Sequence, residues 1–221
     1  MILKKRGAVL FGLFLAAACR PPLPALIPPP VLRDVAGLAT LKIVRAEGSA
    51  RSKFGFAIAF PDRGRIDVLD PLGRTALQFL VEGDDAYLVL PSKRAYARGA
   101  RGEVLKRFLG FPVELEELAG LLAGRWEKGG ENISPGWILE RDGRGRVSAG
   151  RRGDLSFAVL EFYPGGGVPR RVSFNGAGSE GTVTLHRAAF NGGLAPFSPR
   201  FRERFRAVSW EEIERLMGDE G

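Results

Sequence analysis

The sequence has few of the residues that most often carry catalysis or bind metals. Cys19 is its one cysteine and His186 its one histidine, in a chain of 221 residues. A lone cysteine has no partner for a disulfide within the chain. His186 falls in a predicted strand, with no cysteine, aspartate or glutamate at the spacing of a metal site. We therefore interpret His186 as a structural or surface residue, and we predict no metal, no cofactor and no catalytic residue.

Familiar catalytic and phosphate-binding motifs are absent as well. The chain has no Gly-x-Ser-x-Gly elbow. The run Pro-Gly-Gly-Gly at 164–167 is not followed by a helix that carries Lys-Ser or Lys-Thr, so it indicates a turn. Glu-Gly-Asp-Asp at 82–85 indicates another turn, because no further calcium ligands follow at the required spacing. Glu114, Glu116 and Glu117 are expected on an exposed helix face. These absences predict that the protein is not an enzyme.

Acidic residues are outnumbered by basic ones. The chain has 33 lysines and arginines against 25 aspartates and glutamates, a net charge of +8, and it keeps 30 against 25 without the three basic residues at 4–6. Arginines cluster at 141–152, 170–171 and 200–206. Because the N-terminal residues described below predict export, and the chain has no helix-turn-helix or base-stacking signature, we predict no nucleic-acid partner. Anionic lipid head groups, or solvent alone, remain alternative surroundings for these clusters.

The N-terminal apolar run is too short to span a bilayer as a permanent helix. It covers 8–15, follows the basic residues at 4–6 and precedes three alanines at 16–18, which together are typical of a secretory signal peptide over 1–18. Cys19 follows directly. This arrangement resembles the lipobox of bacterial lipoproteins, in which the cysteine receives a diacylglycerol and becomes the mature N-terminus. The alternative is an ordinary signal peptide followed by an incidental cysteine.

The residues after Cys19 predict a tether. Arg20 stands where an aspartate would retain an enterobacterial lipoprotein at the inner membrane, so the lipobox resemblance implies the outer membrane. The proline-rich run 21–30 cannot form a helix or an inner strand, and it favours a semi-rigid spacer that extends on the order of 30 Å. We therefore divide the chain into the signal peptide, a lipidated cysteine with its tether at 19–30, one domain at 31–208 and a C-terminal helix and tail at 209–221.

Short apolar runs separated by many glycines and prolines predict a β-rich domain. The clearest strand is 53–60, where large apolar residues alternate with glycine, alanine or lysine and share one face. Apolar residues at helical spacing in 31–40 predict a short helix before the strands. The other predicted strands, mostly in an antiparallel meander, are 41–50, 65–69, 74–80, 86–90, 137–140, 146–149, 155–163, 168–174 and 182–188.

Three further helices are predicted. Those at 103–109 and 114–122 are amphipathic and are separated by Gly-Phe-Pro at 110–112, which interrupts helical pairing. A third, at 210–217, ends the chain. The apolar stripes of the first two helices are compatible with a packed core or with the wall of a ligand site, and periodicity alone does not decide between them.

The turn 70–73, Asp-Pro-Leu-Gly, carries a large apolar residue at its tip. Pro71 sets φ and Gly73 tolerates positive φ, so the composition is that of a tight turn. Turns lie at the surface, which predicts an exposed Leu72 unless its side chain folds back on the hairpin. An exposed leucine there would contact a membrane or a ligand.

The stretch 66–79, followed about thirty residues later by 108–115, resembles the LolB family of outer-membrane lipoprotein receptors, within the LolA/LolB lipoprotein-carrier superfamily. In that family an Asn-Pro-Leu-Gly turn precedes a strand, and a Gly-(Met or aromatic)-Pro-(apolar) break separates two short helices. This chain has Asp70 in place of the asparagine. The resemblance covers roughly 35–190.

The resemblance implies a mainly β (α+β) fold: an unclosed antiparallel β-barrel with a lid of short α-helices over a hydrophobic cavity. It implies a monomeric outer-membrane lipoprotein, on the periplasmic face of a Gram-negative bacterium, that accepts lipoprotein acyl chains from a LolA-like periplasmic carrier. Pro71, Leu72 and Gly73 would form the loop that meets outer-membrane lipid during insertion. The acyl-chain cavity would be lined by Phe54, Phe56, Ile58, Phe60, Leu77, Phe79, Phe108, Leu115, Leu118 and Leu122.

Two other functions remain open from the sequence. One is a carrier of lipid or another hydrophobic ligand on the same fold, which would be recognised by what copurifies in the cavity. The other is an assembly scaffold at the outer membrane, for which the interior would be tightly packed and Leu72 would belong to a protein interface.

Overall fold

The structure is a computed structural model that describes residues 23–45, 48–109, 113–128, 131–132, 136–176, 179–193 and 200–218. The predicted signal peptide and Cys19 lie outside these ranges, as does the break at 110–112. The side chain of Phe108 is also outside the described part of the chain.

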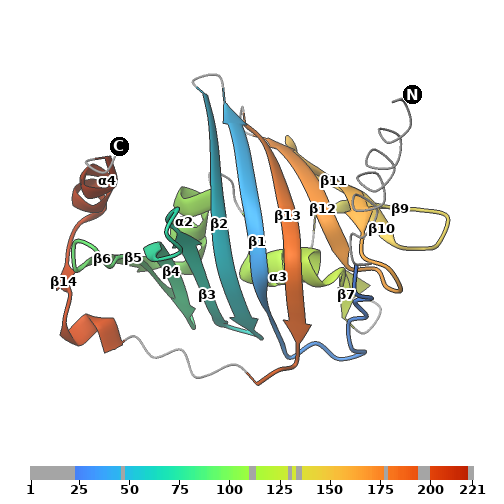
Figure 1. Ribbon diagram of the computed structural model, residues 1–221, viewed down its shortest axis with the longest axis horizontal. Helices are drawn as coiled ribbons and strands as arrows, with labels where there is room; N and C mark the ends of the chain where they lie inside the picture. Colours follow the sequence, from blue (N-terminus) through green and yellow to red (C-terminus); the bar gives the residue numbers. More distant parts are fainter. Residues whose placement is uncertain are drawn as a thin grey trace, which may run out of the picture.

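One curved sheet of twelve strands dominates the described residues (Figure 1). Its order is β14-β6-β5-β4-β3-β2-β1-β13-β12-β11-β10-β9, and its two end strands do not pair, so the sheet is unclosed. All neighbouring strands are antiparallel except β14 and β6, which are parallel. The strands are β1 (Asp34–Arg45), β2 (Gly48–Ala59), β3 (Arg63–Leu69), β4 (Thr75–Glu82), β5 (Asp85–Leu90), β6 (Ala95–Ala100), β9 (Ile138–Arg141), β10 (Val147–Arg152), β11 (Leu155–Phe162), β12 (Pro169–Gly176), β13 (Ser179–Phe190) and β14 (Arg206–Ala207). The predicted mainly β, unclosed antiparallel architecture is confirmed.

Short helices complete the fold. They are α2 (Arg101–Leu109), α3 (Leu115–Ala123) and α4 (Trp210–Gly218), with a 3₁₀ turn, η1 (Arg200–Glu203), and a separate two-stranded pair, β7 (Glu127–Lys128) and β8 (Glu131–Asn132). The three predicted helices at 103–109, 114–122 and 210–217 are confirmed within two residues at each end. In Figure 1, α3 lies across one face of the sheet, behind β1 and β13.

The predicted helix at 31–40 is wrong, because β1 begins at Asp34 and pairs with β2 on one side and β13 on the other. Val35 and Ala39 are fully buried. Residues four apart share a face in a strand as well as in a helix, so this spacing is compatible with either period. Because β1 is paired with a neighbouring strand on both sides, this segment is a strand and not a helix. The predicted strand 41–50 accordingly contains the end of β1 and the start of β2.

The alternation in β2 positions the core. Phe54, Phe56 and Ile58 are buried on the face of the sheet that α3 covers. Gly37 of β1 pairs with Phe56, and a Cβ on Gly37 would lie 2.6 Å from the Phe56 ring and 2.3 Å from the Arg187 carbonyl oxygen. A side chain at position 37 would therefore displace the Phe56 ring from the core.

The start and end of α3 are both well defined. Glu114 at the N-cap and Glu117 form a capping box, in which each side chain bonds the backbone N–H of the other. At the other end Gly124 has φ 66° and donates its N–H to the carbonyls of Gly120 and Leu121. A Cβ on Gly124 would also lie 2.1 Å from the Gly167 carbonyl oxygen. The helix therefore ends at a glycine. Both the positive φ and the close approach of the Gly167 carbonyl require glycine at position 124.

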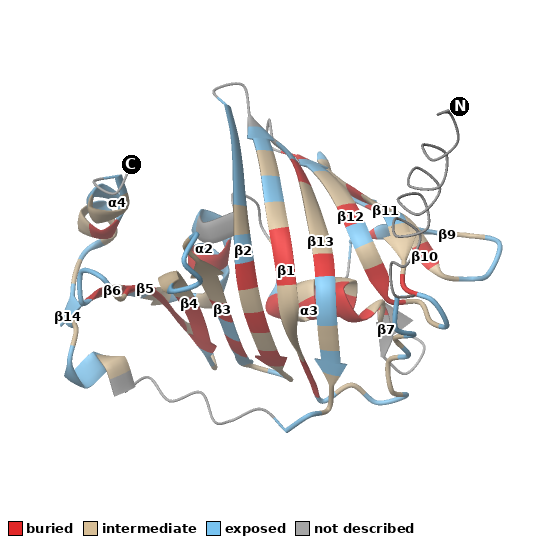
Figure 2. Ribbon diagram, viewed as in Figure 1, coloured by how far each residue is buried: buried red, intermediate tan, exposed pale blue. Residues whose placement is uncertain are grey.

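The C-terminal segment, 200–218, packs on both faces of the sheet at its β6 end. Ile213 of α4 is fully buried and packs with Leu88, Leu90 and Ala97 on one face of β5 and β6. On the other face, Phe201 and Phe205 pack against a cluster that includes Tyr87 and Val89. Between them β14 pairs with β6. Burial therefore continues to this end of the sheet, as the red segments of β5 in Figure 2 show.

The N-terminal segment at 23–32 lies against the domain. The Leu26 N–H donates to the Pro164 carbonyl (3.2 Å), and the Arg125 Nη2 donates to the carbonyls of Pro28 (3.2 Å) and Pro29 (2.5 Å). The Leu26 side chain packs against the main core. Residues 26–29 of the predicted tether are thus held by the domain, so only the part before Leu26 could act as a spacer.

Candidate functional site

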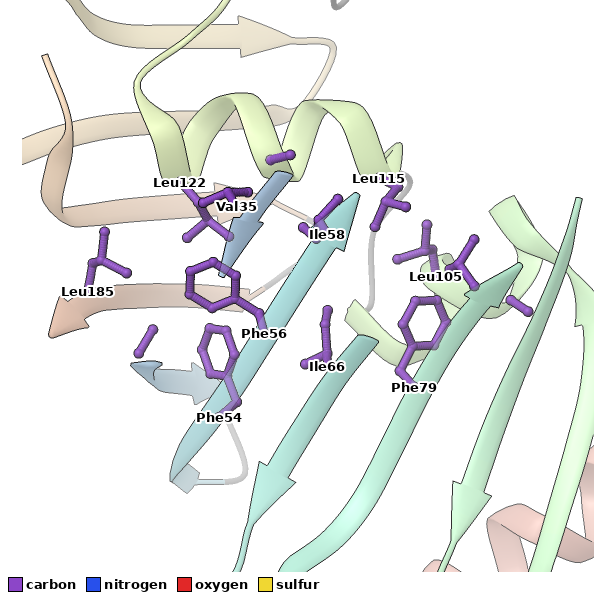
Figure 3. Packing of buried hydrophobic residues seen from close by; sticks show 14 of the residues in the cluster. Val35, Phe54, Phe56, Ile58, Ile66, Phe79, Leu105, Leu115, Leu122 and Leu185 are labelled. Atoms are coloured by element: carbon purple, nitrogen blue, oxygen red, sulfur yellow. The ribbon is translucent and has the colours of Figure 1, made fainter. Parts of the chain in front are cut away.

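The candidate site is the apolar interior between the sheet and helices α2 and α3 (Figure 3). Its residues converge from β1 to β4, β13 and the two helices, and each is 0 to 9% exposed. The rings of Phe54 and Phe56 lie 6.2 Å apart. Figure 3 shows these rings, Ile58 and Leu122 close together beside α3. We define the apolar interior as Val35, Phe54, Phe56, Ile58, Ile66, Phe79, Leu105, Leu115, Leu122 and Leu185.

Most of the residues predicted to line an acyl-chain cavity meet in this interior. Phe54, Phe56, Ile58, Phe79, Leu115 and Leu122 belong to it, and Phe60 and Leu118 are partly buried against it. Leu77 shares the same face of β4, but it packs in the neighbouring cluster under α4. Phe108 is carried by α2. Whether any of these residues contacts an acyl chain stays a prediction.

Ile66 and Leu105 were absent from the predicted lining. Ile66 pairs with Phe56 on one side and with Phe79 on the other, so it lies in the same cross-strand row. Strand register was the signal that could have identified it, because residues directly opposite each other share a face. Leu105 is fully buried and belongs to the apolar stripe of α2.

The residues of the apolar interior are at most 9% exposed. Among the described residues, one hollow of about 360 Å³ includes Lys42, Val44 and Glu180 in its wall, and another of about 300 Å³ lies beside Arg125. Neither is lined by a residue of the apolar interior. Because these side chains are covered by α2, α3 and the sheet, an outward movement of a helix would be one way for an acyl chain to reach them.

A buried carboxylate holds α3 in place. Glu117, predicted to be exposed, is only 3% exposed, which corrects that prediction. Its Oε1 accepts from Arg152 Nη1 (2.5 Å) and Trp137 Nε1 (3.2 Å), and its Oε2 accepts from Arg152 Nη2 (3.1 Å) and the Glu114 N–H (3.0 Å). The Arg152 guanidinium also lies 4.9 Å from the centre of the Trp137 ring. Charge pairing offsets the cost of burying Glu117 and joins α3 to β10.

Weaker ion pairs join the helices to one another. Arg101 at the start of α2 lies 3.9 Å from Glu114 and 3.7 Å from Glu116. Arg107, near the end of α2, bonds Glu214 of α4 at 2.9 Å and lies over the Trp210 ring. Because these pairs are solvated, each contributes little, and the Glu117 contacts are the principal polar attachment of α3.

The turn between β3 and β4 presents Leu72 to solvent. The side chain is 77% exposed, so it does not fold back on its hairpin. Asp70 rigidifies the turn: its Oδ1 accepts from the Leu72 and Arg74 N–H groups (both 2.9 Å), and its Oδ2 accepts from Arg74 Nε (2.7 Å). These bonds, led by that from the Arg74 backbone, lower the pKa of Asp70. Gly73 has φ 80°, as the turn composition predicted.

The exposed leucine is close to the end of the apolar interior. Phe54 pairs with Val68, and Val68 pairs with Leu77, so these three residues form the row that lies one residue before the last paired row at the turn. Leu72 comes four residues after Val68 along the chain. At about 3.3 Å per strand residue, the turn begins less than about 10 Å beyond that row.

Other kinds of site receive no support from the described ranges. No three histidine, cysteine, aspartate or glutamate side chains there are grouped so that they could hold a metal ion. Among the same residues, no helix combines the length and apolar character needed to cross a bilayer.

No protein-family model matches the sequence, and no curated protein matches it. The fold is similar to several solved structures at low identity. A putative outer membrane lipoprotein-sorting protein domain from Vibrio parahaemolyticus has 14% identity and a TM-score of 0.46, covering 77% of this chain and 90% of that one. A LolA superfamily protein from Nitrosomonas europaea has 11% identity and a TM-score of 0.49, covering 79% and 91%. The Mycobacterium tuberculosis lipoprotein LppX has 13% identity and a TM-score of 0.30, covering 74% and 89%.

Proposed function

We propose that the protein is an outer-membrane lipoprotein that accepts the acyl chains of other lipoproteins from a LolA-like periplasmic carrier and inserts them into the outer membrane. The observation that carries this proposal is Leu72, 77% exposed at the tip of a turn that Asp70 rigidifies, next to one end of the apolar interior. A large apolar residue held out in this way suits contact with lipid. The lipobox at Cys19 would place the domain at a membrane.

In the proposed mechanism, acyl chains enter between α3 and the sheet. Leu115 rests in space that Gly64 leaves open, since a Cβ on Gly64 would lie 2.8 Å from a Leu115 methyl carbon. If α3 moved outward, Leu115 and Leu122 would leave the phenylalanine side chains of β2 open to a ligand. The chains would replace the contacts of α3 with the sheet, at about 25 cal/mol per Å² of apolar surface buried. No covalent chemistry is required.

Transfer onward would be driven by burial in the bilayer. Each methylene that moves into a lipid environment contributes about 0.8 kcal/mol, so a bilayer that covers whole acyl chains competes well with a partly covered site. Leu72, entering the interface first, would bring the open end of the apolar interior to the lipid.

A transfer assay tests this function. The full-length protein in vesicles would be mixed with a carrier loaded with radiolabelled lipoprotein, and label would be followed to the protein and then to the vesicle lipid. We expect Leu72→Glu to accept label but to release little of it to lipid, because a carboxylate at the tip resists entry into the interface. Ile138→Glu, at another exposed apolar position (57% exposed), serves as the matched control and should transfer normally. Equal transfer by both variants would remove the insertion role of Leu72.

The burial of the apolar interior and the exposure of Leu72 also fit a second candidate, an assembly scaffold at the outer membrane in which Leu72 is part of a protein interface. A scaffold would take up no label from a competent carrier. A carrier of other hydrophobic ligands would also take up no lipoprotein, but it would copurify with lipid.

A further inference from the structure

The outer face of the sheet, opposite the apolar interior, carries a group of cations. Side chains alternate along β2, so Arg51 and Lys53 point away from the face that holds Phe54. Lys42 of β1 pairs directly with Arg51 and therefore shares the outer face. All three cations are exposed, and the start of β2 is pale blue in Figure 2. Like charges directly opposite each other destabilise a sheet, so this arrangement has a cost to the fold.

A fourth cation extends the group across the sheet. Thr40 pairs with Lys53 on one side and with Thr184 on the other, and Thr184 pairs with Arg171 of β12. At about 4.8 Å between neighbouring strands, this row extends about 14 Å. We define the cationic face as Lys42, Arg51, Lys53 and Arg171.

Acidic side chains do not neutralise the cationic face. Within the described ranges, no ion pair joins any of its four members to a carboxylate. Asp67, Glu161 and Glu180 lie on the same face of the sheet. Asp67 is bonded by Arg65 (2.7 Å) and Glu161 by Arg170, which leaves Glu180 as the one carboxylate of these three without an arginine. The cationic face therefore keeps an excess of positive charge.

This charge acts on a neighbouring histidine. His186 lies against Thr40 on the same face, with its Nε2 2.7 Å from the Thr40 Oγ1. Burial lowers the pKa of His186, and the charges of Lys53, Arg170 and Arg51 lower it further. Positive charge is thus concentrated on this part of the sheet.

The cationic face lies at the same end of the strands as Leu72. Lys53 pairs with Leu69, the last residue of β3, and the turn that carries Leu72 follows directly. Because β2 begins before Lys53, the hairpin of β1 and β2 extends past this turn (Figure 1). On its outer face the hairpin also carries Val44, which is 42% exposed. Two exposed apolar side chains therefore accompany the cations.

We propose that the cationic face is a docking surface for a membrane that contains anionic lipid head groups. The cations are spread over β1, β2 and β12, and the hollow of about 360 Å³ is lined by Lys42 but by none of the other three. This spread suits an extended anionic surface better than a single small anion. Binding at a membrane interface combines attraction to anionic lipid with burial of apolar side chains, which Val44 and Leu72 supply. The inference rests on the proposed location of the protein at a membrane.

Binding to vesicles tests the surface. The mature chain that the lipobox predicts, from residue 19 and carrying Cys19→Ser so that no lipid anchors it, would be sedimented with vesicles. One set would contain phosphatidylcholine alone, and the other would also contain phosphatidylglycerol. We expect tighter binding to the second set, and we expect that binding to weaken as salt is added, because salt screens exposed charges.

Three variants locate the binding. Lys42→Gln and Arg51→Gln each remove one cation, and each should lower the partition coefficient on anionic vesicles about fivefold. Arg63→Gln is the matched control, because Arg63 is exposed on the same face at the opposite end of β3, and it should bind like the original protein. Lys42→Gln should leave the thermal midpoint the same or higher, since it removes a like-charge pair, so weaker binding would not reflect unfolding.

Three outcomes would overturn the proposal. The first is equal binding to both sets of vesicles. The second is an equal loss in Lys42→Gln and Arg63→Gln, which would show diffuse surface charge. The third is unchanged vesicle binding in Lys42→Gln and Arg51→Gln together with slower uptake of label from the carrier, which would assign the face to an acidic protein instead.

The transfer assay separates this inference from the proposed function. Failure of Leu72→Glu to release label, with vesicle binding unchanged in Lys42→Gln and Arg51→Gln, would support the function and overturn the docking surface. Normal release by Leu72→Glu, with vesicle binding lost in those two variants, would support the docking surface and remove the insertion role of Leu72.

Discussion

At the scale of single residues, Asp70 decides how Leu72 is presented. A leucine at the tip of a flexible turn would turn back onto apolar surface for part of the time. The bonds from the Asp70 carboxylate to the Leu72 and Arg74 N–H groups oppose that motion. An asparagine side-chain oxygen could accept the same two bonds, which is why the two residues are interchangeable at the first position of such turns.

We expect Asp70→Ala to loosen the turn and Asp70→Asn to preserve it. The alanine variant leaves the Leu72 and Arg74 N–H groups to water, so their amide hydrogens should exchange faster, whereas the asparagine variant should stay close to the original protein. Amide hydrogen exchange by NMR measures this directly. Equal protection in all three proteins would show that the Asp70 side chain does not hold the turn.

His186 gives a second prediction at this scale. Its Nε2 lies 2.7 Å from the Thr40 Oγ1, and Thr40 is 5% exposed. Partial desolvation, ahead of the positive charges of Lys53, Arg170 and Arg51, lowers the pKa of His186. The unfolded chain therefore takes up a proton first as the pH falls below about 6.5, and the stability that His186 contributes is lost from there downward.

His186→Gln removes this titration and keeps a group that can bond Thr40. We expect the variant to lose less stability than the original protein between pH 7 and pH 5, as measured by urea denaturation at several pH values. Because carboxylates titrate mainly below this range, their contribution should be similar in both proteins. Parallel stability curves would contradict the assignment.

At the scale of elements, the proposed entry of acyl chains depends on the free energy that holds α3 against the sheet, and this free energy can be measured. Its apolar side lies on the sheet, and its buried polar residue, Glu117, bonds Arg152 of β10. These attachments act together, so an entering chain would have to displace both. Weakening the polar one alone should reveal how much it restrains the helix.

We expect Glu117→Gln to destabilise the fold by about 2 kcal/mol, because it removes a buried charge and leaves Arg152 with a neutral partner. The same change should speed the uptake of a fluorescent fatty acid if α3 is the moving element. Glu116→Gln is the matched control: its carboxylate lies 3.7 Å from Arg101 and is partly solvated, so stability should change by less than about 1 kcal/mol. Loss of stability without faster uptake would mean that ligand does not enter beneath α3.

Sequence patterns predicted an element correctly where the spacing of apolar residues fitted either a strand or a helix but not both. The alternation of Phe54, Phe56 and Ile58 has no helical interpretation, and β2 forms as predicted. Val35 and Ala39 fit both periods, and only pairing with β2 and β13 decides for a strand. The strand β6 and the edge strand β14 went unpredicted because their six and two residues carry no sustained apolar alternation.

Contacts between residues far apart in the sequence could not be predicted from the spacing of residue types. Glu117 belongs to a run of acidic residues that is typical of a solvated helix face, and its partner Arg152 follows 35 residues later. Leu77 was predicted with Phe79 in one lining, but it packs against the cluster that contains Ile213, which the C-terminal segment brings to β5 and β6. Both cases depend on how the helices pack, which local periodicity does not specify.

At the scale of the whole molecule, the docked N-terminal segment and Leu72 lie at opposite ends of the strands. The β3–β4 turn follows the end of β3, whereas the turn 164–167, which holds Leu26, precedes β12 at the other end of the strands. The seven residues of β3 alone extend about 23 Å. With Leu26 held, the seven steps of the predicted tether from Cys19 to Leu26 span at most about 25 Å. An anchored domain standing on this tether would therefore keep Leu72 away from its own bilayer.

Release of the segment would remove this restriction. We expect Leu26→Ser, which weakens its packing against the core, to let Leu72 approach the membrane more often. Full-length protein anchored in vesicles and carrying Leu72→Cys with an environment-sensitive dye would report a more apolar dye environment in the Leu26→Ser background. Leu23→Ser is the matched control, because Leu23 is 38% exposed and precedes the held residues.

Identical dye spectra in the Leu26→Ser and Leu23→Ser backgrounds would contradict a restraint by the docked segment. In that case the domain would have to lie on its side, with β3 along the membrane, for Leu72 to enter the lipid. Dye placed at Val44 by Val44→Cys would distinguish the two arrangements. Val44 is 42% exposed near the end of β1, at the same end of the strands as the β3–β4 turn. If that end of the strands approached the membrane, both positions should reach the lipid together.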